Sequence, residues 1–85
     1  MKEFQYTIQD KLGLHARPAG LVVKEANQYT SEIIIRKGEK STSATQLMRL
    51  MAMSIKKGDT ITVSAEGKDE EAAIRGMQDL FSKYL

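Results

Sequence analysis

The only histidine and the only proline of the chain lie close together, at His15 and Pro18. A neutral imidazole is a nucleophile that is usable near pH 7. Proline has a fixed φ and no N–H, which suits the first turn of a helix. The apolar residues that follow, over 19–26, recur at helical spacing. We therefore predict that His15 lies at or next to the N-terminus of a helix.

A helix N-terminus carries unpaired backbone N–H groups and the positive end of the helix dipole, so it is a ready site for a phosphate. Because Pro18 has no N–H, the backbone N–H groups of Ala16 and Arg17 are the expected donors to phosphate oxygens. The Arg17 guanidinium adds a planar fork that suits the same oxygens. Phosphoryl transfer asks mainly for positioning and charge stabilisation. We therefore predict a phosphoryl acceptor at His15 that needs no metal and no other cofactor on this chain.

The overall composition indicates one small domain, over residues 1–85, with room for a single compact core. The absence of cysteine excludes disulfides and thiolate metal sites, and one histidine speaks against a structural zinc. A net charge of +2, from 13 basic and 11 acidic residues, is too balanced to indicate nucleic acid by itself. No signal peptide and no apolar run of about 20 residues is recognisable, so we predict a cytosolic protein without membrane insertion.

Four stretches are predicted to form strands: 3–8, 32–36, 41–43 and 60–65. The first and last alternate between polar and apolar residues, which is typical of half-buried strands. Their inward side chains should be Phe4, Tyr6 and Ile8, and Ile61, Val63 and Ala65. The second is rich in β-branched residues, and a tight turn around Gly38 joins it to the third.

Three apolar stripes at helical spacing predict three helices whose stripes face the core. Ser43 or Thr45 is the expected N-cap of the second helix and Asp69 that of the third. For the methionines of the second helix, core packing is favoured over an adaptable docking patch. The stripes are Ala19, Val22, Val23, Ala26 and Tyr29; then Leu47, Met48, Leu50, Met51 and Ile55; then Ala73, Ile74, Met77, Leu80, Phe81 and Tyr84.

The resulting element order is β-α-β-β-α-β-α. Strands with one polar face and helices with one apolar stripe predict a two-layer α+β domain. In it, a four-stranded antiparallel sheet is covered on one face by the three helices.

Residues 13–19, which read Gly-Leu-His-Ala-Arg-Pro-Ala and open a helix after a first strand, closely resemble the active-site signature of the HPr family. This family comprises the histidine-containing phosphocarriers of bacterial sugar phosphotransferase systems. The resemblance covers the whole chain and implies an open-faced β-sandwich. It further implies that His15 accepts a phosphoryl group on Nδ1 from Enzyme I and passes it to a sugar-specific Enzyme IIA domain, with Arg17 as the family arginine.

The resemblance also implies a partner-docking surface on the first two helices, formed by Gly20, Leu21, Lys24, Leu47, Met48, Arg49 and Met51. Family members often have a small residue where this chain has Arg49. Many also carry a regulatory serine at the start of the second helix, and here that position is Gln46. Glutamine has no hydroxyl to phosphorylate, so we expect this switch to be absent. A shifted site at Ser43 or Thr45 would need a different kinase register.

The leading hypothesis is therefore a monomeric, reversible phosphoryl carrier for sugar uptake, without catalysis of its own. The alternative within the family is a regulatory or nitrogen-type paralogue, whose phosphorylated form signals without feeding transport. From another class, a small RNA-binding module is the remote alternative. The inward orientation of Phe4 and Tyr6 speaks against it, because it leaves no aromatic platform on the sheet for stacking bases.

Overall fold

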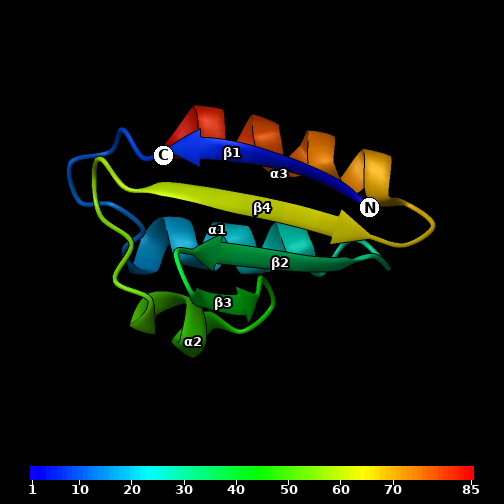
Figure 1. Ribbon diagram of the computed structural model, residues 1–85, viewed down its shortest axis with the longest axis horizontal. Helices are drawn as coiled ribbons and strands as arrows, with labels where there is room; N and C mark the ends of the chain where they lie inside the picture. The colour runs from blue at the N-terminus through cyan, green and yellow to red at the C-terminus, as the bar shows by residue number, and fades with distance from the viewer.

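The computed structural model describes residues 1–85 and contains the predicted order of strands and helices (Figure 1). Each boundary lies within a few residues of its expected place. The elements are β1 (Lys2–Thr7), α1 (Ala16–Ala26), β2 (Glu32–Lys37), β3 (Lys40–Ser43), α2 (Leu47–Ala52), β4 (Thr60–Glu66) and α3 (Glu70–Tyr84).

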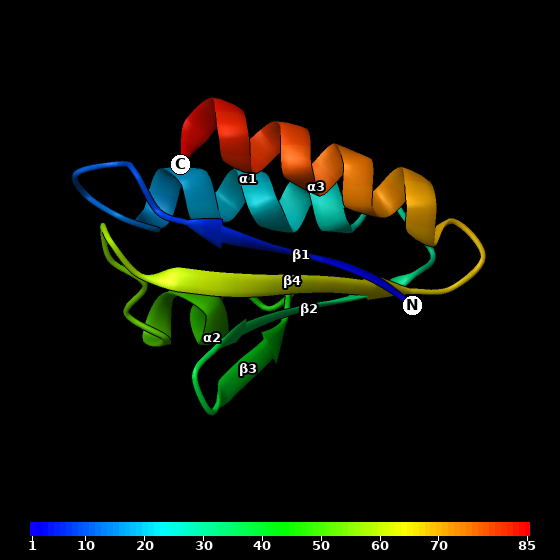
Figure 2. The same cartoon turned by 45° about the horizontal axis from the view of Figure 1, so that its top comes forward.

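The four strands form one antiparallel sheet in the order β1-β4-β2-β3. The last strand in sequence, β4, lies between β1 and β2, and Val63 pairs with Phe4 on one side and Ile35 on the other. In Figure 2, α1 and α3 lie side by side on one side of this sheet. The short α2 contacts α1 and β3. The predicted two-layer α+β fold is confirmed.

One core lies between the sheet and the helices. The alternation of β4 is confirmed, because Ile61, Val63 and Ala65 are all fully buried. Phe81 of α3 is also fully buried, and the rings of Phe4 and Tyr6 meet it edge-on at centroid distances of 6.0 and 5.8 Å. Such edge-to-face pairs are favourable aromatic contacts. Both rings of β1 are therefore part of the helix-covered side, as expected, and offer no stacking platform on the open face of the sheet.

The prediction for the second helix is wrong in part. Only Leu50 of α2 is buried, whereas Leu47 and Met51 are exposed and Met48 is 77% exposed. The helix ends at Ala52, so the chain after it brings Met53 and Ile55 into the core from a loop. The N-cap position is Gln46, without a side-chain cap bond, in place of the expected Ser43 or Thr45.

A long-range clamp holds the loop that follows α2. Lys37 of β2 donates from Nζ to the carbonyl of Ser54 at 2.8 Å and lies 2.9 Å from the Asp59 carboxylate. Asp59 also accepts from the backbone N–H of Lys56 at 2.8 Å. That hydrogen bond and the Lys37 ammonium lower the pKa of Asp59. The clamp fixes the backbone of Ile55, on which the loop before α1 rests.

The third helix departs from expectation at both ends. Tyr84 is 44% exposed, so it is not part of the buried stripe. Asp69 is at the N-cap position, but its carboxylate accepts from Ser31 and from the backbone N–H of Thr30 at 2.9 Å, and caps nothing. These bonds, that from the Ser31 hydroxyl foremost, hold the pKa of Asp69 at about 2. Asp69 thus ties the segment between α1 and β2 to the start of α3.

The exit from α1 makes a second, partly buried contact with α3. The Tyr29 hydroxyl donates to the Glu25 carboxylate at 2.6 Å, and this bond raises the pKa of Tyr29 to about 12. The pair packs where Gly76 of α3 leaves room, since a Cβ there would lie 2.1 Å from the Tyr29 oxygen. Tyr29 is partly buried and lies beyond the end of the helix, although its spacing fitted the apolar stripe of α1.

None of the three helices combines the length and apolar character that a transmembrane span requires.

Candidate functional site

His15 is the N-cap residue of α1, with extended backbone angles of φ −87° and ψ −176°. Its carbonyl accepts the first helical hydrogen bond, from the N–H of Ala19 at 3.0 Å. The imidazole makes no cap bond to the helix and its side chain is 39% exposed. The only histidine thus faces solvent at the helix end, which is where the sequence predicted it.

The first turn of α1 has unused backbone donors. The N–H groups of Ala16 and Arg17 donate to no acceptor in the protein, and Pro18 has none to donate. The Arg17 guanidinium is exposed and makes no ion pair and no hydrogen bond. Two free N–H groups at the positive end of a helix, beside a guanidinium, form an arrangement that accepts an anion.

The loop before α1 is held on both sides. At the C-cap of α3, the carbonyl oxygen of Leu85 accepts from the N–H groups of Gln9, at 2.5 Å, and Asp10, at 3.0 Å. From the loop after α2, the carbonyl of Ile55 accepts from the N–H of Leu14 at 2.9 Å. The loop also closes on itself, because the Gly13 N–H donates to the Asp10 carbonyl at 3.0 Å. His15 therefore stands on a backbone fixed by two distant segments.

A shallow hollow of about 260 Å³ opens beside the imidazole. Asp10 and Tyr84 line it, and neither was among the predicted site residues. The carboxylate nearest the imidazole is that of Asp10, whose Oδ2 lies 3.6 Å from His15 Nε2. Tyr84 was assigned to the core by its helical spacing, and Asp10 gave only the local signal of an acidic loop residue shortly before His15. The lining residues are Asp10, His15, Arg17, Pro18, Leu21 and Tyr84.

The residues assigned to docking occupy adjoining parts of α1 and α2, which contact one another. From α1, Lys24 is exposed, whereas Gly20 and Leu21 are half-buried and Leu21 packs partly against the core. From α2, the exposed side chains are Leu47, Met48, Arg49 and Met51. The two helices thus bring an exposed apolar surface with basic neighbours close to the His15 loop, which adds the 72% exposed Leu12.

Gln46 stands at the N-cap of α2, where no hydroxyl is present. The nearby hydroxyls of Ser43 and Thr45 hydrogen bond to each other at 2.8 Å. Ser43 also accepts from the backbone N–H of Thr45 at 3.3 Å. Both hydroxyls are thus engaged with one another before the helix begins.

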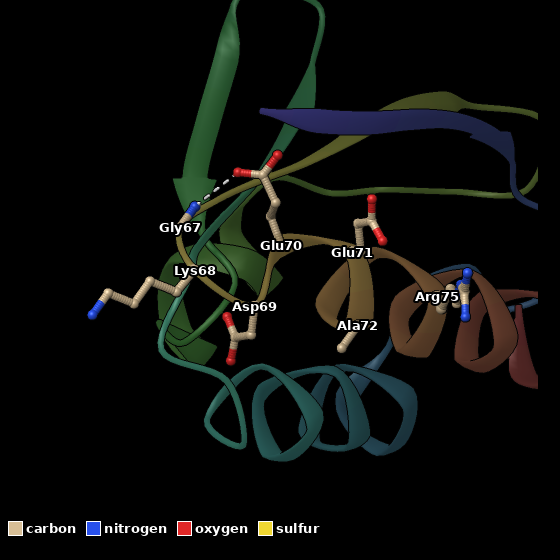
Figure 3. Close-up of a pocket in the computed structure, with 7 residues that line it drawn as sticks. All are labelled: Gly67, Lys68, Asp69, Glu70, Glu71, Ala72 and Arg75. Carbon is tan, nitrogen blue, oxygen red and sulfur yellow. Dashed lines mark hydrogen bonds between the residues drawn. The ribbon is translucent and has the colours of Figure 1, made fainter.

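A second hollow, of about 520 Å³, lies at the start of α3, at the opposite end of the molecule from the start of α1 (Figures 1 and 3). Its acidic groups already have partners: Glu70 accepts from the Gly67 N–H at 3.1 Å, and Asp69 binds the segment after α1. No three His, Cys, Asp or Glu side chains come together as a metal site anywhere in the chain. The unsatisfied donors and the imidazole coincide only at the start of α1, so that is the candidate site.

Comparison with known proteins shows which family the chain resembles. The family model described as "PTS HPr component phosphorylation site" matches residues 2–83. Phosphocarrier protein HPr of Mycoplasma capricolum subsp. capricolum is 44% identical over 78 residues, which cover 92% of this chain and 88% of that protein. HPr-like protein Crh of Halalkalibacterium halodurans is 47% identical over 77 residues, which cover 91% and 92%.

Solved structures with similar folds and sequences belong to proteins of the same kind as these relatives. The histidine-containing phosphocarrier protein of Mycoplasma superimposes with a TM-score of 0.94 at 40% identity, over 96% of this chain and 93% of that chain. An HPr dimer of Thermoanaerobacter tengcongensis is also similar, with a TM-score of 0.78 at 41% identity, over 98% and 95%.

Proposed function

Because the chain belongs to the HPr family of phosphocarrier proteins, we propose that His15 accepts a phosphoryl group from phosphorylated Enzyme I and donates it to Enzyme IIA domains. The donated group would serve the uptake and phosphorylation of sugars. A member of this family is a phosphoryl-transfer component of the phosphotransferase system and no independent catalyst. We assign this role to one HPr-like domain over residues 1–85, with its single core cluster.

The observation that carries the proposal is the pair of free N–H groups, on Ala16 and Arg17, beside the exposed imidazole. In the transfer, the lone pair of His15 Nδ1 forms a bond to phosphorus while the bond from phosphorus to the donor breaks, and its electron pair stays with the donor. The assignment of Nδ1 rests on the family resemblance. The free N–H groups then receive the phosphoryl oxygens, and each charge-assisted hydrogen bond contributes about 1.5–3 kcal/mol.

Arg17 supplies the charge that the backbone lacks. Its guanidinium has no competing acidic partner in the protein and lines the hollow beside His15. It can therefore turn toward the phosphoryl oxygens without breaking an existing ion pair. We assign it to stabilising the transferred group, together with the helix end.

For docking, we propose the exposed surface formed by α1 and α2 beside the site. Its centre is apolar, with Met48 the most exposed side chain, and flexible methionines adapt to different partners. Lys24 and Arg49 add positive charge for acidic surfaces. Because the resemblance implies a small residue at this position in many family members, Arg49 makes this part of the surface bulkier and more basic.

The test is incubation with phosphoenolpyruvate and purified Enzyme I, followed by acid and by base treatment of the product. A phosphohistidine loses its phosphate in acid and keeps it in base. We expect this pattern in the wild-type chain, no product with His15→Ala, and slower transfer with Arg17→Ala while circular dichroism stays unchanged. Base-labile phosphate, or full labelling of His15→Ala, would contradict the proposal.

A second candidate, a regulatory or nitrogen-type paralogue, is favoured by one observation: an HPr-like protein Crh is 47% identical to this chain. Both roles use the same His15 chemistry, so the partner decides. We would load the chain with labelled phosphate and offer a sugar-specific and a nitrogen-type Enzyme IIA in parallel. Transfer to the sugar-specific domain supports the carrier role, and transfer to the nitrogen-type domain alone supports the paralogue.

Two further expectations complete the proposal. We propose that the carrier acts as a monomer. Sedimentation equilibrium would test this, since a dimeric structure is known for a similar HPr.

We also propose that serine phosphorylation at the start of α2 is absent, because the residue there is Gln46. Stoichiometric serine phosphate after incubation with an HPr kinase and ATP would overturn this.

A further inference from the structure

We propose that Asp10 is a positioning residue for His15: its carboxylate keeps the imidazole proton on Nε2, so that Nδ1 holds the lone pair that takes up the phosphoryl group. This inference rests on the proposed function and deepens it, because it assigns a role to a residue outside the signature at 13–19. It depends on the placement of one carboxylate oxygen, on how the loop holds that oxygen, and on the chemistry of the imidazole ring.

The placement is unusual for a carboxylate. Asp10 Oδ2 is buried and is the only buried side-chain nitrogen or oxygen of the protein without a hydrogen-bond partner. An unsatisfied buried acceptor is unfavourable and calls for a partner. The one charged or chargeable group recorded beside it is His15 Nε2, at 3.6 Å. This exceeds hydrogen-bond length, but contacts in unloaded sites are often long and shorten when the reacting group arrives.

The loop holds the backbone from which the carboxylate projects. The N–H of Asp10 donates to the Leu85 carbonyl and its own carbonyl accepts from Gly13, both at 3.0 Å. Gly13 in turn lies against the backbone of Ile55 so closely that a Cβ would come within 2.4 Å of the carbonyl oxygen. The backbone of Asp10 is therefore held from α3 and from the loop after α2. The imidazole side chain is 39% exposed, and a small rotation of its ring would close the gap.

Competing partners for Asp10 are missing. Arg17 lines the same hollow, but no ion pair joins it to the carboxylate. Tyr84 also lines the hollow and donates no hydrogen bond to Asp10. The carboxylate therefore has no partner that competes with His15 Nε2. The free N–H groups of Ala16 and Arg17 remain available to a phosphoryl group.

The chemistry follows from the two ring nitrogens. A neutral imidazole carries one proton, and a carboxylate that faces Nε2 selects the tautomer with the proton there, as carboxylate–histidine pairs do elsewhere. When the Nδ1 lone pair bonds to phosphorus, the ring retains its Nε2 proton and becomes positively charged. The negative charge of Asp10 offsets that charge. When the phosphoryl group leaves, the electron pair of the N–P bond returns to Nδ1 and the ring is neutral again.

The test uses the only histidine of the chain, whose two ring nitrogens give assignable signals in nitrogen-15 NMR. Recorded at a pH where the ring is neutral, the wild-type spectrum should show Nε2 protonated and Nδ1 unprotonated. In Asp10→Ala the two shifts should move toward those of free histidine. Acceptance and donation of phosphate should both slow by about tenfold, the low end of the effect of removing an outer partner of a functional histidine. Asp10→Asn keeps the shape without the charge and should fall between them.

The matched control is Asp79→Ala, which removes the same charge from an exposed position on α3 that makes no hydrogen bond and no ion pair. It should keep the wild-type rates. The inference is overturned if the wild-type proton resides on Nδ1, a measurement that needs no variant. Rates of Asp10→Ala and Asp10→Asn within twofold of the control would overturn it as well. A wild-type chain that Enzyme I does not label would instead refute the proposed function, whatever the tautomer.

Discussion

Gly13 is the point where the His15 loop touches the loop after α2, so Gly13→Ala tests the architecture of the site. The backbone of Gly13 has a φ of +66°, in the left-handed region. A Cβ built there would lie 2.4 Å from the Ile55 oxygen and 2.7 Å from the Lys56 Cα. Because both neighbours are backbone atoms, no side chain can move aside and the loops themselves must separate.

Two terms set the size of the effect. An alanine in the left-handed region costs about 1–2 kcal/mol. Separating the loops also breaks the hydrogen bond from Leu14 to Ile55, now 2.9 Å long, which contributes about 0.5–1.5 kcal/mol. The expected loss of about 1.5–3.5 kcal/mol is a large part of the 5–15 kcal/mol of a typical domain. For a chain of this size the melting temperature should fall by about 6–28 °C.

Urea and thermal unfolding, followed by circular dichroism, measure this loss against two matched glycines. Gly38 has a φ of +60° but nothing within 4 Å, so Gly38→Ala should show only the backbone term of about 1–2 kcal/mol. Gly20 lies in α1 with open space around it, and Gly20→Ala should stabilise the chain by about 0.5–1 kcal/mol. If Gly13→Ala loses no more than Gly38→Ala, the close approach of the two loops is refuted.

The pKa of Asp69, at about 2 against an ordinary 3.8, means that its carboxylate stabilises the fold above about pH 4 and that this stability is lost as the pH falls toward 2. Asp69→Asn should make the midpoint of urea unfolding less dependent on pH over that range. An unchanged pH dependence of the midpoint would contradict this. The pKa of Tyr29, about 12 against 10.0, means that stability present below pH 10 is lost as the pH rises through 12. Ultraviolet titration should show one late tyrosine that Tyr29→Phe removes. Met48→Ser should change stability by less than about 0.5 kcal/mol but slow transfer to partners, whereas Leu50→Ala should cost about 2–5 kcal/mol; urea unfolding and a transfer assay separate the two. His15→Ser should abolish phosphate acceptance yet stabilise the fold by about 0.5–1 kcal/mol, by capping α1, and a loss of stability would refute this.

The sheet and the two long helices were predictable because their signals are local. The period-two alternation of β4 places Ile61, Val63 and Ala65 on one face, and all three are fully buried. In α3 the helical spacing likewise buries Ala73 and Met77. Such patterns are set by backbone geometry alone, so they do not depend on which other segments pack nearby.

The short second helix was less predictable because distant residues decide where it ends. Lys37 of β2 captures the carbonyl of Ser54, whose φ of 53° turns the chain out of the helix. Ile55 then reaches the core from the loop, although its spacing fitted a helical stripe. No feature within residues 47–55 indicates this contact with β2. The apolar pattern therefore predicted a helix that extends further than the observed one.

The residues of the candidate site also fall into those with a local signal and those that distant contacts put in place. His15 and Arg17 could be assigned from consecutive residues, because the donors of a helix start lie within one turn of each other. Asp10 lies 3.6 Å from Nε2, on a backbone that the distant Leu85 carbonyl holds by a hydrogen bond. Tyr84 lines the same hollow for a related reason: the last turn of α3 passes beside the loop. The parts of the site that tertiary packing assembles could not be derived from spacing.

The start of α1 shows how function and stability oppose each other in this chain. A Ser, Thr, Asp or Asn at the N-cap would accept a hydrogen bond from the helix and stabilise it. Here the N-cap is His15, which makes no such bond, and the N–H groups of Ala16 and Arg17 stay unsatisfied. Under the proposed function these free donors are the ones that a phosphoryl group would use, and a capping side chain would compete for the Arg17 N–H. In the phosphorylated protein these N–H groups should have an acceptor. The phosphorylated protein should therefore be more stable than the unphosphorylated one.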